Sequence, residues 1–515
     1  MPSLDRAAID PDADRVVRKL TRAGYKAYLV GGCVRDLLVQ RTPKDWDVAT
    51  SATPNEIKAT FRNSRIIGRR FRLAHVFFGS KIIETSTFRA NPREEDEHDL
   101  LIRRDNVFGT ETEDARRRDF TINGLFYDVE REEVIDHVGG LADLDAKLIR
   151  TIGDPDVRFQ EDPVRMLRAV KFAARLSFGF EPATWRALLR WRGEISKCAA
   201  PRLLEEMHRL MRGGAARRSF ELLVETGALA VLSPYLAGLL EGPGAPAVAP
   251  AITTQTVPKP TVAMVEYVDE DPAEHDPDDP DELERMAHAA DIAEGLEPEE
   301  DGEDDEEGDE EGDENLDAEE QAWHRVWADE PVARPAAAAP VRLSFLGGGP
   351  DLVKRRQLAW EALGGIDRAV KDGKDPSNAV AFGAVLAPFI YGGTDEPRGG
   401  DLHGAIQELA NPVIVQLHVT RRDSERLRYI LIAQKRLLAA KKKGGQAEIA
   451  GGRELIDDAV LLFEVLERAA GHEVTSVPTV ATGDGRDDDE GDDDPNNPRK
   501  RRRRRRGGRR RRHGA

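Results

Sequence analysis

Apolar positions near the start of the chain change from helical spacing to short strand-like runs. In residues 1–24, Val16, Val17, Leu20 and Ala23 fall on one side of an expected amphipathic helix. Short β-rich runs follow, and the expected strands are Ala27–Val30, Trp46–Ala49, His75–Phe78, Lys81–Thr85 and Leu125–Asp128. The pattern predicts an N-terminal helix followed by a small module of strands and helices.

A helix is also predicted between the second and third of these strands. Thr53 caps it, Pro54 occupies its first turn, and Glu56 completes a capping box, so the helix should extend to about Phe61.

Helical periodicity dominates after about residue 155. The clearest expected helices are Val164–Leu176, Pro182–Cys198, Pro201–Arg212, Val380–Ile390, Glu425–Leu438 and Glu454–Ala469. A Met and Leu stripe at helical spacing, Leu203, Met207, Leu210 and Met211, is interpreted as core. The predicted fold class is α+β: a head with a mixed β-sheet and helices, followed by helical regions.

Two segments break this periodicity. Residues 242–341 consist largely of Pro, Ala, Gly and acids, and residues 476–515 are acidic and then arginine-rich. Such compositions bury too little apolar surface to offset the entropy of ordering, so both are predicted to be disordered. The expected domain limits are 1–24, 25–150, 151–241, 242–341, 342–475 and 476–515.

Charge is distributed very unevenly along the 515 residues. The formal net charge is −19, yet every residue from Glu299 to Glu314 is Asp, Glu or Gly, and Arg499–Arg512 is all Arg and Lys apart from two glycines. The two cysteines, Cys33 and Cys198, are far apart and indicate a reducing compartment rather than a disulfide scaffold. With no signal peptide and no apolar run of membrane-spanning length, a cytoplasmic protein without a membrane partner is expected.

Residues suited to phosphate and metal binding follow the first expected strand. Gly31 and Gly32 allow backbone N–H groups to approach a phosphate at the start of a helix. In an extended run, Asp45 and Asp47 point to the same face, where both can bind Mg²⁺, while Trp46 faces the other way. A glycine turn followed by a solvated acidic loop is the plainer alternative, but the two halves together favour a nucleotide and metal site.

A third carboxylate on a neighbouring strand usually completes such a site. Glu84 is the candidate, and an exposed strand glutamate without a function is an equally good interpretation of that residue by sequence alone.

The motifs Leu29–Leu38 and Lys44–Thr50 resemble those of the nucleotidyltransferases that extend RNA 3′ ends. This is the class II family of bacterial poly(A) polymerases and CCA-adding tRNA enzymes, with a polymerase-β-like head and helical neck, body and RNA-binding domains. In the expected order, Arg117–Leu125 resembles its ribose-binding motif, Gly139–Leu144 its hinge and Glu161–Arg168 its base-reading helix. The close resemblance covers about residues 25–180.

The resemblance implies roles for individual side chains. Asp45, Asp47 and Glu84 would be catalytic. Asp45 and Asp47 would hold Mg²⁺ or Mn²⁺, and ATP would be the substrate. Arg35, Arg118 and neighbouring Arg117 would face phosphates, with Asp36 as a salt-bridge partner that could instead orient Arg35. Asp119 would meet the ribose and Asn123 the sugar–phosphate side; their spacing of four predicts one shared helical face.

The resemblance also implies that one helix carries the base-reading set. Glu161, Asp162 and Arg165 would read the Watson–Crick edge of the incoming base, with Asp162 and Arg165 paired along one face. Arg168 could contact phosphate, fix Asp162 or only solvate the helix, and the sequence does not separate these.

The choice within the family rests on basic segments. Ile67–Val76 resembles the arginine-rich strand of bacterial poly(A) polymerases, and the arginine tail suits sequence-tolerant grip on single-stranded RNA. Polyadenylation of RNA 3′ ends by a monomer, with RNA-decay machinery as a partner, is the expected function; CCA addition to tRNA is the alternative.

Two rivals come from other classes of protein. A non-catalytic RNA-binding adaptor should have lost its metal carboxylates, but Asp45 and Asp47 are present. A fused phosphohydrolase is rejected because Asp136-His137 has no second His-Asp cluster to accompany it.

Overall fold

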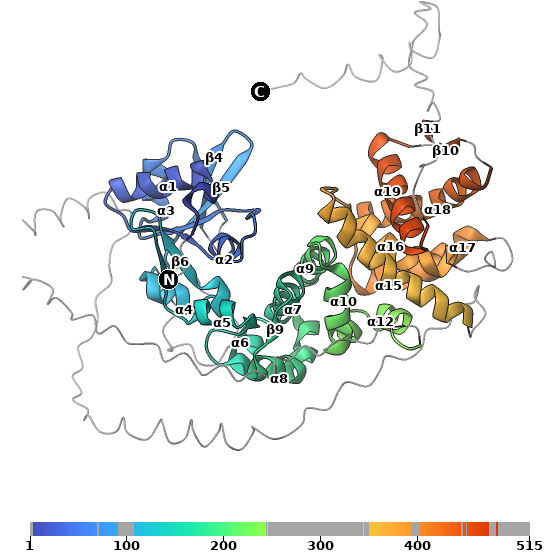
Figure 1. Ribbon diagram of the computed structural model, residues 1–515, viewed down its shortest axis with the longest axis horizontal. Coiled ribbons are helices and arrows are strands. Elements are labelled where there is room, and N and C mark those ends of the chain that lie inside the picture. Colours follow the sequence, from blue (N-terminus) through green and yellow to red (C-terminus); the bar gives the residue numbers. More distant parts are fainter. Residues whose placement is uncertain are drawn as a thin grey trace, which may run out of the picture. The chain divides into compact units, whose positions relative to one another are not determined.

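The computed structural model describes residues 4–68, 72–90, 108–243, 245, 343, 350–392, 401–443, 446–449, 451–472 and 480–482 (Figure 1). Most of the predicted acidic segment at 242–341 and of the basic tail at 476–515 lies outside these residues, as do residues 69–71 of the arginine-rich run.

A seven-stranded mixed sheet forms the head, in the order β3-β4-β5-β2-β1-β6-β7. Its strands are β1 (Ala27–Val30), β2 (Asp47–Thr50), β3 (Ser64–Ile67), β4 (Leu73–Phe78), β5 (Lys81–Thr87), β6 (Leu125–Asp128) and β7 (Glu133–Asp136). Of the neighbouring strand pairs in this sheet, as far as the structure describes it, β2 and β5 run parallel and the others run antiparallel. The predicted mixed sheet is confirmed, and β2 and β5 become neighbours through a crossover.

All five predicted strands are present, with small shifts of their ends. β1 and β6 have the predicted limits, whereas β2 begins at Asp47 rather than Trp46. Sequence reasoning missed β3 and β7, which are the two edge strands of the sheet. An edge strand is covered on fewer sides, so its apolar pattern is weaker; on β7, Glu133 is exposed and the other three residues are only half-buried.

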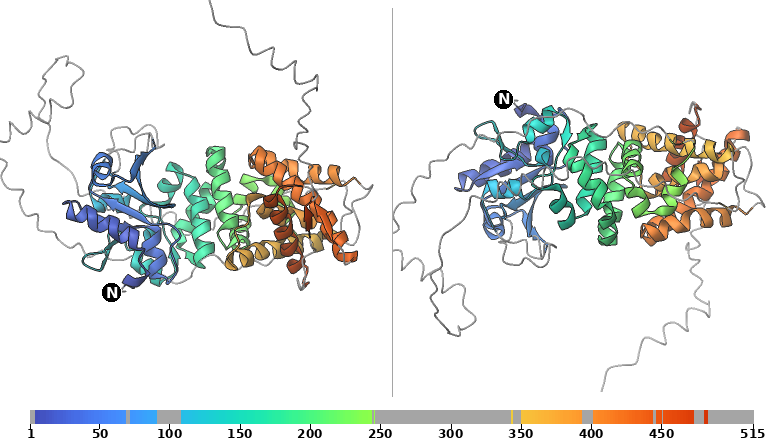
Figure 2. Two further views of the ribbon diagram at one scale, coloured as in Figure 1. Left: turned by 90° about the horizontal axis from the view of Figure 1, so that it is seen from above. Right: turned by 90° about the horizontal axis from the view of Figure 1, so that it is seen from below.

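Helix α1 (Pro11–Arg22) lies against this sheet in Figures 1 and 2. Its buried residues are Ala13, Val16, Val17 and Leu20. The prediction for Ala23 was wrong, because the helix ends at Arg22 and Ala23 is an exposed C-terminal cap. The helix predicted after Thr53 is confirmed as α3 (Pro54–Thr60), and both hydrogen bonds of its capping box are present.

Short elements complete the head and lead into the helical region. They are η1 (Arg6–Ala8), α2 (Gly32–Leu38), α4 (Glu111–Arg116), η3 (Thr121–Asn123), α5 (Gly140–Asp145), β8 (Leu148–Ile149) and β9 (Gly179–Phe180). One core cluster of the head joins Val30, Ala49, Phe88, Ala115 and Phe126 across the centre of the sheet.

Helices follow, as predicted. They are α6 (Pro155–Glu161), α7 (Val164–Leu176), α8 (Pro182–Trp191), η4 (Arg192–Lys197), α9 (Ala200–Arg212), α10 (Ala216–Glu225), α11 (Ala228–Leu232) and α12 (Pro234–Leu240). The single helix expected over Pro182–Cys198 is instead α8 followed by the 3-10 turn η4. Met207, Leu210 and Met211 are buried as predicted, but Leu203 is only half-buried and Leu204 is the buried leucine in that turn.

The later helices are α15 (Pro350–Lys371), α16 (Asn378–Tyr391), α17 (Leu402–Gln416), α18 (Arg421–Lys443) and α19 (Arg453–Ala469). A short parallel pair of strands, β10 (Ala447–Ile449) and β11 (Val480–Thr482), departs from the all-helical expectation. None of the helices among the described residues has the length and apolar character needed to cross a membrane.

Candidate active site

Two of the predicted catalytic carboxylates lie side by side on parallel strands. Asp47 begins β2, and its Cα partner on β5 is Glu84. The crossover that pairs β2 with β5 therefore brings Glu84 beside Asp47, where the proposed third carboxylate would have to lie. Asp45 is exposed in a bend just before β2, so it is not itself a strand residue. Trp46 is buried, but it lines the same groove as Asp45 and Glu84, so the expected strand alternation across Asp45-Trp46-Asp47 is not seen.

The carboxyl group of Asp47 is electrostatically strained. Burial raises its pKa to about 6, and the negative charges of Glu84 and Asp45 act in the same direction, while Arg118 opposes them. Glu84 also has His75 nearby, with 3.8 Å between Nε2 and Oε1. A buried acid beside two like charges is the electrostatic setting in which a divalent cation is favoured.

The donor set fits a hard divalent cation, because Asp45, Asp47 and Glu84 offer only carboxylate oxygens. Over the part of the chain that the structure describes, no three His, Cys, Asp or Glu side chains are gathered closely enough to form a complete metal site. Mg²⁺ commonly keeps several waters and takes only one or two protein carboxylates, so two or three separate acids suffice as ligands.

Gly31 occupies the turn between β1 and α2 in a conformation that other residues rarely adopt. Its φ is 72°, and a Cβ there would lie 2.9 Å from Nη1 of Arg118. Gly32 already belongs to α2, and a Cβ there would meet its nearest neighbour, Nη2 of Arg35, at 3.7 Å. The first glycine is therefore required by conformation and by the closeness of Arg118, whereas the second is not.

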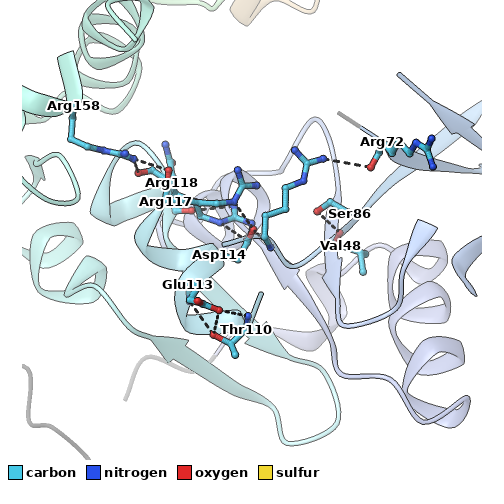
Figure 3. A network of polar contacts seen from close by, with 11 residues as sticks. Val48, Arg72, Ser86, Thr110, Glu113, Asp114, Arg117, Arg118 and Arg158 are labelled. Carbon is cyan, nitrogen blue, oxygen red and sulfur yellow. Dashed lines mark hydrogen bonds and ion pairs between the residues drawn. The ribbon is translucent and has the colours of Figure 1, made fainter. Parts of the chain in front are cut away.

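Arg118 is held beside this turn by a buried acid. Asp114 accepts hydrogen bonds from Arg117 at 3.0 Å and from Arg118 at 2.8 Å (Figure 3). The Arg118 guanidinium also lies 5.2 Å from the centre of the Phe126 ring. The Arg158 side chain donates to the backbone carbonyls of Arg117 and Arg118 at 2.7 and 2.6 Å. Sequence reasoning found the two arginines but neither Asp114 nor Arg158.

A continuous polar chain runs from α2 to α7. Arg35 donates to Asp36 and to Asn123, Asn123 donates to Asp119, and Asp119 receives Arg168. At the other end, Arg175 pairs with Asp36 at 2.9 Å. Burial alone would raise the pKa of Asp119, but Arg168 and the hydrogen bonds lower it to about 2.

These polar contacts bear on three expectations from the sequence. Arg35 is 2% exposed and hydrogen-bonded to Asp36 and Asn123, so the expected salt bridge between Arg35 and Asp36 is present, while contact of Arg35 with a triphosphate stays a prediction. Asp119 and Asn123 do pair, at 3.0 Å, but across a 3-10 turn and not along one helical face. The reason is Phe120, which is extended and forms a bridge with Thr151. Arg168 pairs with Asp119 at 2.6 Å, a role that sequence reasoning did not consider.

The proposed base-reading residues lie on two helices rather than one. Glu161 ends α6 and Arg165 is in the first turn of α7, with Asp162 and Pro163 between them. Arg165 pairs with Glu161 at 2.7 Å. Asp162 pairs with Arg202 at 2.8 Å through one oxygen, and its buried second oxygen, Oδ1, has no hydrogen-bond partner. The predicted Asp162–Arg165 pair is therefore wrong, because Pro163 interrupts the helix.

The contacts of Asp136 and His137 are with the neighbouring turn and with the core of the head. The Asp136 carboxylate accepts hydrogen bonds from the backbone N–H groups of four residues of the following turn, Val138, Gly139, Gly140 and Leu141. Burial lowers the pKa of His137, and its ring lies 6.1 Å from that of Phe126. These contacts stabilise the turn, and the hinge role that the resemblance implies for Gly139–Leu144 stays a prediction.

Two parts of the chain match known families. Residues 27–150 match the family described as "Poly A polymerase head domain", and residues 177–240 match "Probable RNA and SrmB- binding site of polymerase A". Poly(A) polymerase I of Salmonella typhimurium is 47% identical over 232 residues, which are 43% of this chain and 50% of that protein. The CCA-adding enzyme of Lactobacillus delbrueckii subsp. bulgaricus is 40% identical over 225 residues, or 43% and 55% of the two chains.

Residues 27–150 and 177–240 are therefore similar to poly(A) polymerases and CCA-adding enzymes. Both kinds of relative are nucleotidyltransferases. A solved relative, the Bacillus stearothermophilus CCA-adding enzyme in complex with CTP, is 34% identical, with a TM-score of 0.39, and the match covers 43% of this chain and 53% of that one. The chain spans about half the length of the curated relatives it matches.

Some residues of this family site could have been found in the sequence. Asp114 stands four residues before Arg118 on a helix, a spacing at which opposite charges pair. Pro163 indicates that the helix is interrupted between α6 and α7. Arg158 and Arg175 gave no such signal, because the contacts of Arg158 with the Arg117 and Arg118 carbonyls and of Arg175 with Asp36 span 40 or more residues.

Proposed function

We propose that this protein is a template-independent polynucleotide adenylyltransferase that extends RNA 3′ ends from ATP. The observation that carries the proposal is the pairing of Asp47 with Glu84 across β2 and β5, two residues after Asp45. The head that holds these acids is similar to the heads of poly(A) polymerases and CCA-adding enzymes. Two parallel strands that present adjacent carboxylates beside a glycine turn suit a reaction at a nucleotide's α-phosphate.

In this reaction the RNA 3′-hydroxyl oxygen attacks the α-phosphorus of ATP. The new P–O bond forms, the bond between the α-phosphorus and the bridging oxygen to the β-phosphate breaks, pyrophosphate leaves and the hydroxyl proton is lost. Asp45 and Asp47, with Glu84 beside them, would hold Mg²⁺ or Mn²⁺. When bound, such ions lower the pKa of the hydroxyl and neutralise charge on the leaving group.

The remaining residues would bind and orient the nucleotide. Gly31 leaves room for the Arg118 guanidinium, which suits bidentate contact with phosphate. Asp114 and Arg158 keep Arg118 in place through its side chain and its backbone. Asp119 and Asn123 would meet the sugar, and Asp162, with one buried oxygen unpaired, would accept from the exocyclic amine of the base.

Polyadenylation is favoured over CCA addition by the degree of similarity. The Salmonella typhimurium Poly(A) polymerase I is 47% identical and the Lactobacillus delbrueckii CCA-adding enzyme 40%, over similar lengths. The arginine-rich tail supports the same choice, because it suits binding of single-stranded RNA without base recognition. Single-stranded RNA ends are therefore the proposed partner, bound by a monomer.

The deciding experiment offers the purified chain two acceptors, an oligo(A) primer and a tRNA that lacks its CCA end, with each nucleoside triphosphate supplied separately. Long products on oligo(A) with ATP alone are expected. Addition limited to two cytidines and one adenosine on the tRNA would instead establish the CCA-adding alternative.

A further inference from the structure

A groove of about 690 Å³ opens onto the catalytic carboxylates from one side of the head. Three segments line it: residues 7–11, residues 42–46, and the turn and start of β5 from Ser80 to Glu84. Two of the three proposed catalytic carboxylates, Asp45 and Glu84, belong to this lining, whereas Asp47, Gly31, Arg118 and Asp119 do not. The groove therefore reaches the reacting centre from a side that the nucleotide-binding residues leave open.

The N-terminal wall of the groove is fixed by ion pairs. Lys81 Nζ lies 2.7 Å from Asp10 and 3.0 Å from Asp12, which ties the start of α1 to the β4–β5 turn. Asp10 also caps α1, accepting from the backbone N–H groups of Asp12 and Ala13 at 2.9 and 3.2 Å. These contacts make the groove a built feature of the head.

The lining combines an exposed apolar surface with a basic side chain. Ile82 is 42% exposed, one of the most exposed large apolar residues that the structure describes. Lys44 is exposed, and no hydrogen bond or ion pair joins it to any described residue. An apolar surface beside a lysine suits a nucleotide unit, whose base packs on apolar atoms and whose phosphate pairs with the ammonium.

We propose that this groove binds the 3′-terminal nucleotides of the single-stranded RNA acceptor, with Lys44 on a backbone phosphate and Ile82 against a base. The inference rests on the proposed function, because that reaction needs a second substrate whose 3′-hydroxyl reaches Asp45 and Glu84. The volume of the groove lies within the range of about 300–1,000 Å³ that is usual for ligand pockets. The groove is thus the acceptor site, separate from the nucleotide side at Gly31 and Arg118.

Steady-state kinetics of the full chain test this directly. AMP incorporation is measured with the primer varied at saturating ATP and then with ATP varied at saturating primer. Lys44→Ala and Ile82→Ala should each raise the KM for an oligo(A) primer by about five- to tenfold while the KM for ATP stays unchanged. An unchanged primer KM, or a KM for ATP that rises in parallel, would overturn the acceptor site.

Matched substitutions control for charge and for apolar surface. Arg131→Ala removes an exposed cation from the β6–β7 turn, at the opposite end of the same sheet. Val157→Ala removes an apolar side chain that is 42% exposed, as Ile82 is. Both should leave the primer KM at the wild-type value. If Ile82→Ala does not fold, Ile82→Thr retains the branched side chain that suits a strand.

Direct binding separates failure of this site from failure of the proposed function. Fluorescence anisotropy of a labelled oligo(A) primer is measured without ATP. If the wild-type chain incorporates no nucleotide, the proposed function fails, and weaker primer binding by Lys44→Ala and Ile82→Ala would still support an RNA groove. Equal binding by wild type and both variants would overturn it, and would leave the groove to a protein segment.

Discussion

The carboxyl group of Asp47 lies at the start of β2 with Glu84 in register on the next strand, and the negative charges of Glu84 and Asp45 both act on it. The pKa of Asp47 is raised from 3.8 to about 6. Between these two pH values the folded protein therefore holds a proton at Asp47 that the unfolded chain has released. Ionisation of this group therefore costs stability, and the cost is incurred as the pH rises through this interval.

Replacing this acid should separate stability from activity. Asp47→Asn is expected to lower AMP transfer by about a thousandfold or more, because a proposed metal ligand is lost. Without divalent cations, the same change should raise the free energy of unfolding above pH 6 by roughly 1–2 kcal/mol, since it removes the charge conflict. Urea unfolding at pH 4.5 and pH 7 measures the second effect.

The control for this substitution is Glu133→Gln on the opposite edge strand, where the side chain is exposed. It should change neither the activity nor the pH dependence of unfolding. Robust residual transfer by Asp47→Asn would contradict its metal role.

Asp119 is the opposite case, an acid whose partners outweigh its burial. Its pKa is lowered to about 2, so its stabilising contribution is complete above about pH 4 and is lost as the pH falls toward 2. Arg168→Met should lower the free energy of unfolding by about 2 kcal/mol at pH 7. The loss should stay constant from pH 8 to pH 4 and shrink below it.

A double-mutant cycle of Arg168→Met with Asp119→Asn checks that the pair itself is responsible. Denaturant unfolding should give a combined loss smaller than the sum of the single losses, because both changes remove one interaction. Strict additivity would show that Arg168 stabilises the protein by other contacts, such as its position 5.6 Å from the Phe172 ring.

Among the elements, the turn from β1 into α2 shows how two adjacent glycines differ. Gly31 has a φ of 72° and the close Arg118 guanidinium, whereas Gly32 is a helical residue at which a Cβ would make only an ordinary van der Waals contact with Arg35. The sequence alone does not distinguish the two glycines; their backbone conformations do.

Alanine at these two positions should have opposite effects on stability. Gly31→Ala should cost about 1–3 kcal/mol through backbone strain and displacement of Arg118, and should also weaken ATP binding. Gly32→Ala should be neutral or stabilise by about 0.5–1 kcal/mol, since alanine favours a helix. Thermal unfolding of both variants measures the difference, and equal losses would refute this account of the turn.

The turn after β7 depends on one acid in a similar way. Asp136→Ala leaves four backbone N–H groups without their acceptor and should lower the free energy of unfolding by about 2–3 kcal/mol. Asp145→Ala, at an exposed position at the end of α5, should stay within about 0.5 kcal/mol of wild type. Chemical denaturation provides both values, and a small effect at Asp136 would reopen a functional role for this pair with His137.

At the scale of the whole molecule, the charge of the chain is divided between unlike segments. A net charge of −19 predicts repulsion from RNA, but the Arg499–Arg512 tail is strongly basic and Glu299–Glu314 is strongly acidic. We hypothesise that the acidic segment competes with RNA for the tail and thereby limits non-specific binding.

Deleting residues 266–320 should raise RNA affinity, and deleting residues 499–515 should lower it and reduce its dependence on salt. Each phosphate contact that is lost should change the slope of log affinity against log salt by about 0.7 for a single strand. Filter binding of oligo(A) at several salt concentrations measures both slopes. The control is the double deletion: if removing residues 266–320 has the same effect with and without the tail, the competition hypothesis is wrong.

Much of the fold could be predicted from local signals. The capping box at Thr53 and Glu56, the limits of β1 and β6 and the buried stripe at Met207 each depend on neighbouring residues, so they were visible in the sequence. The edge strands β3 and β7 were missed because solvent on one side weakens the apolar pattern. The interruption at Pro163 was also a local signal, so the prediction of one continuous helix over Glu161–Arg168 could have been avoided.

By itself, the sequence determined the order of strands and helices, the glycine turn and the candidate acids, because side-chain chemistry and periodicity act over a few residues. Only the tertiary structure decided that Glu84 lies beside Asp47, that Arg35 is buried and that Arg168 belongs to Asp119. These contacts join segments 37 to 88 residues apart. A parallel strand crossover and the packing of α7 bring them together, and no spacing along the chain encodes such distances.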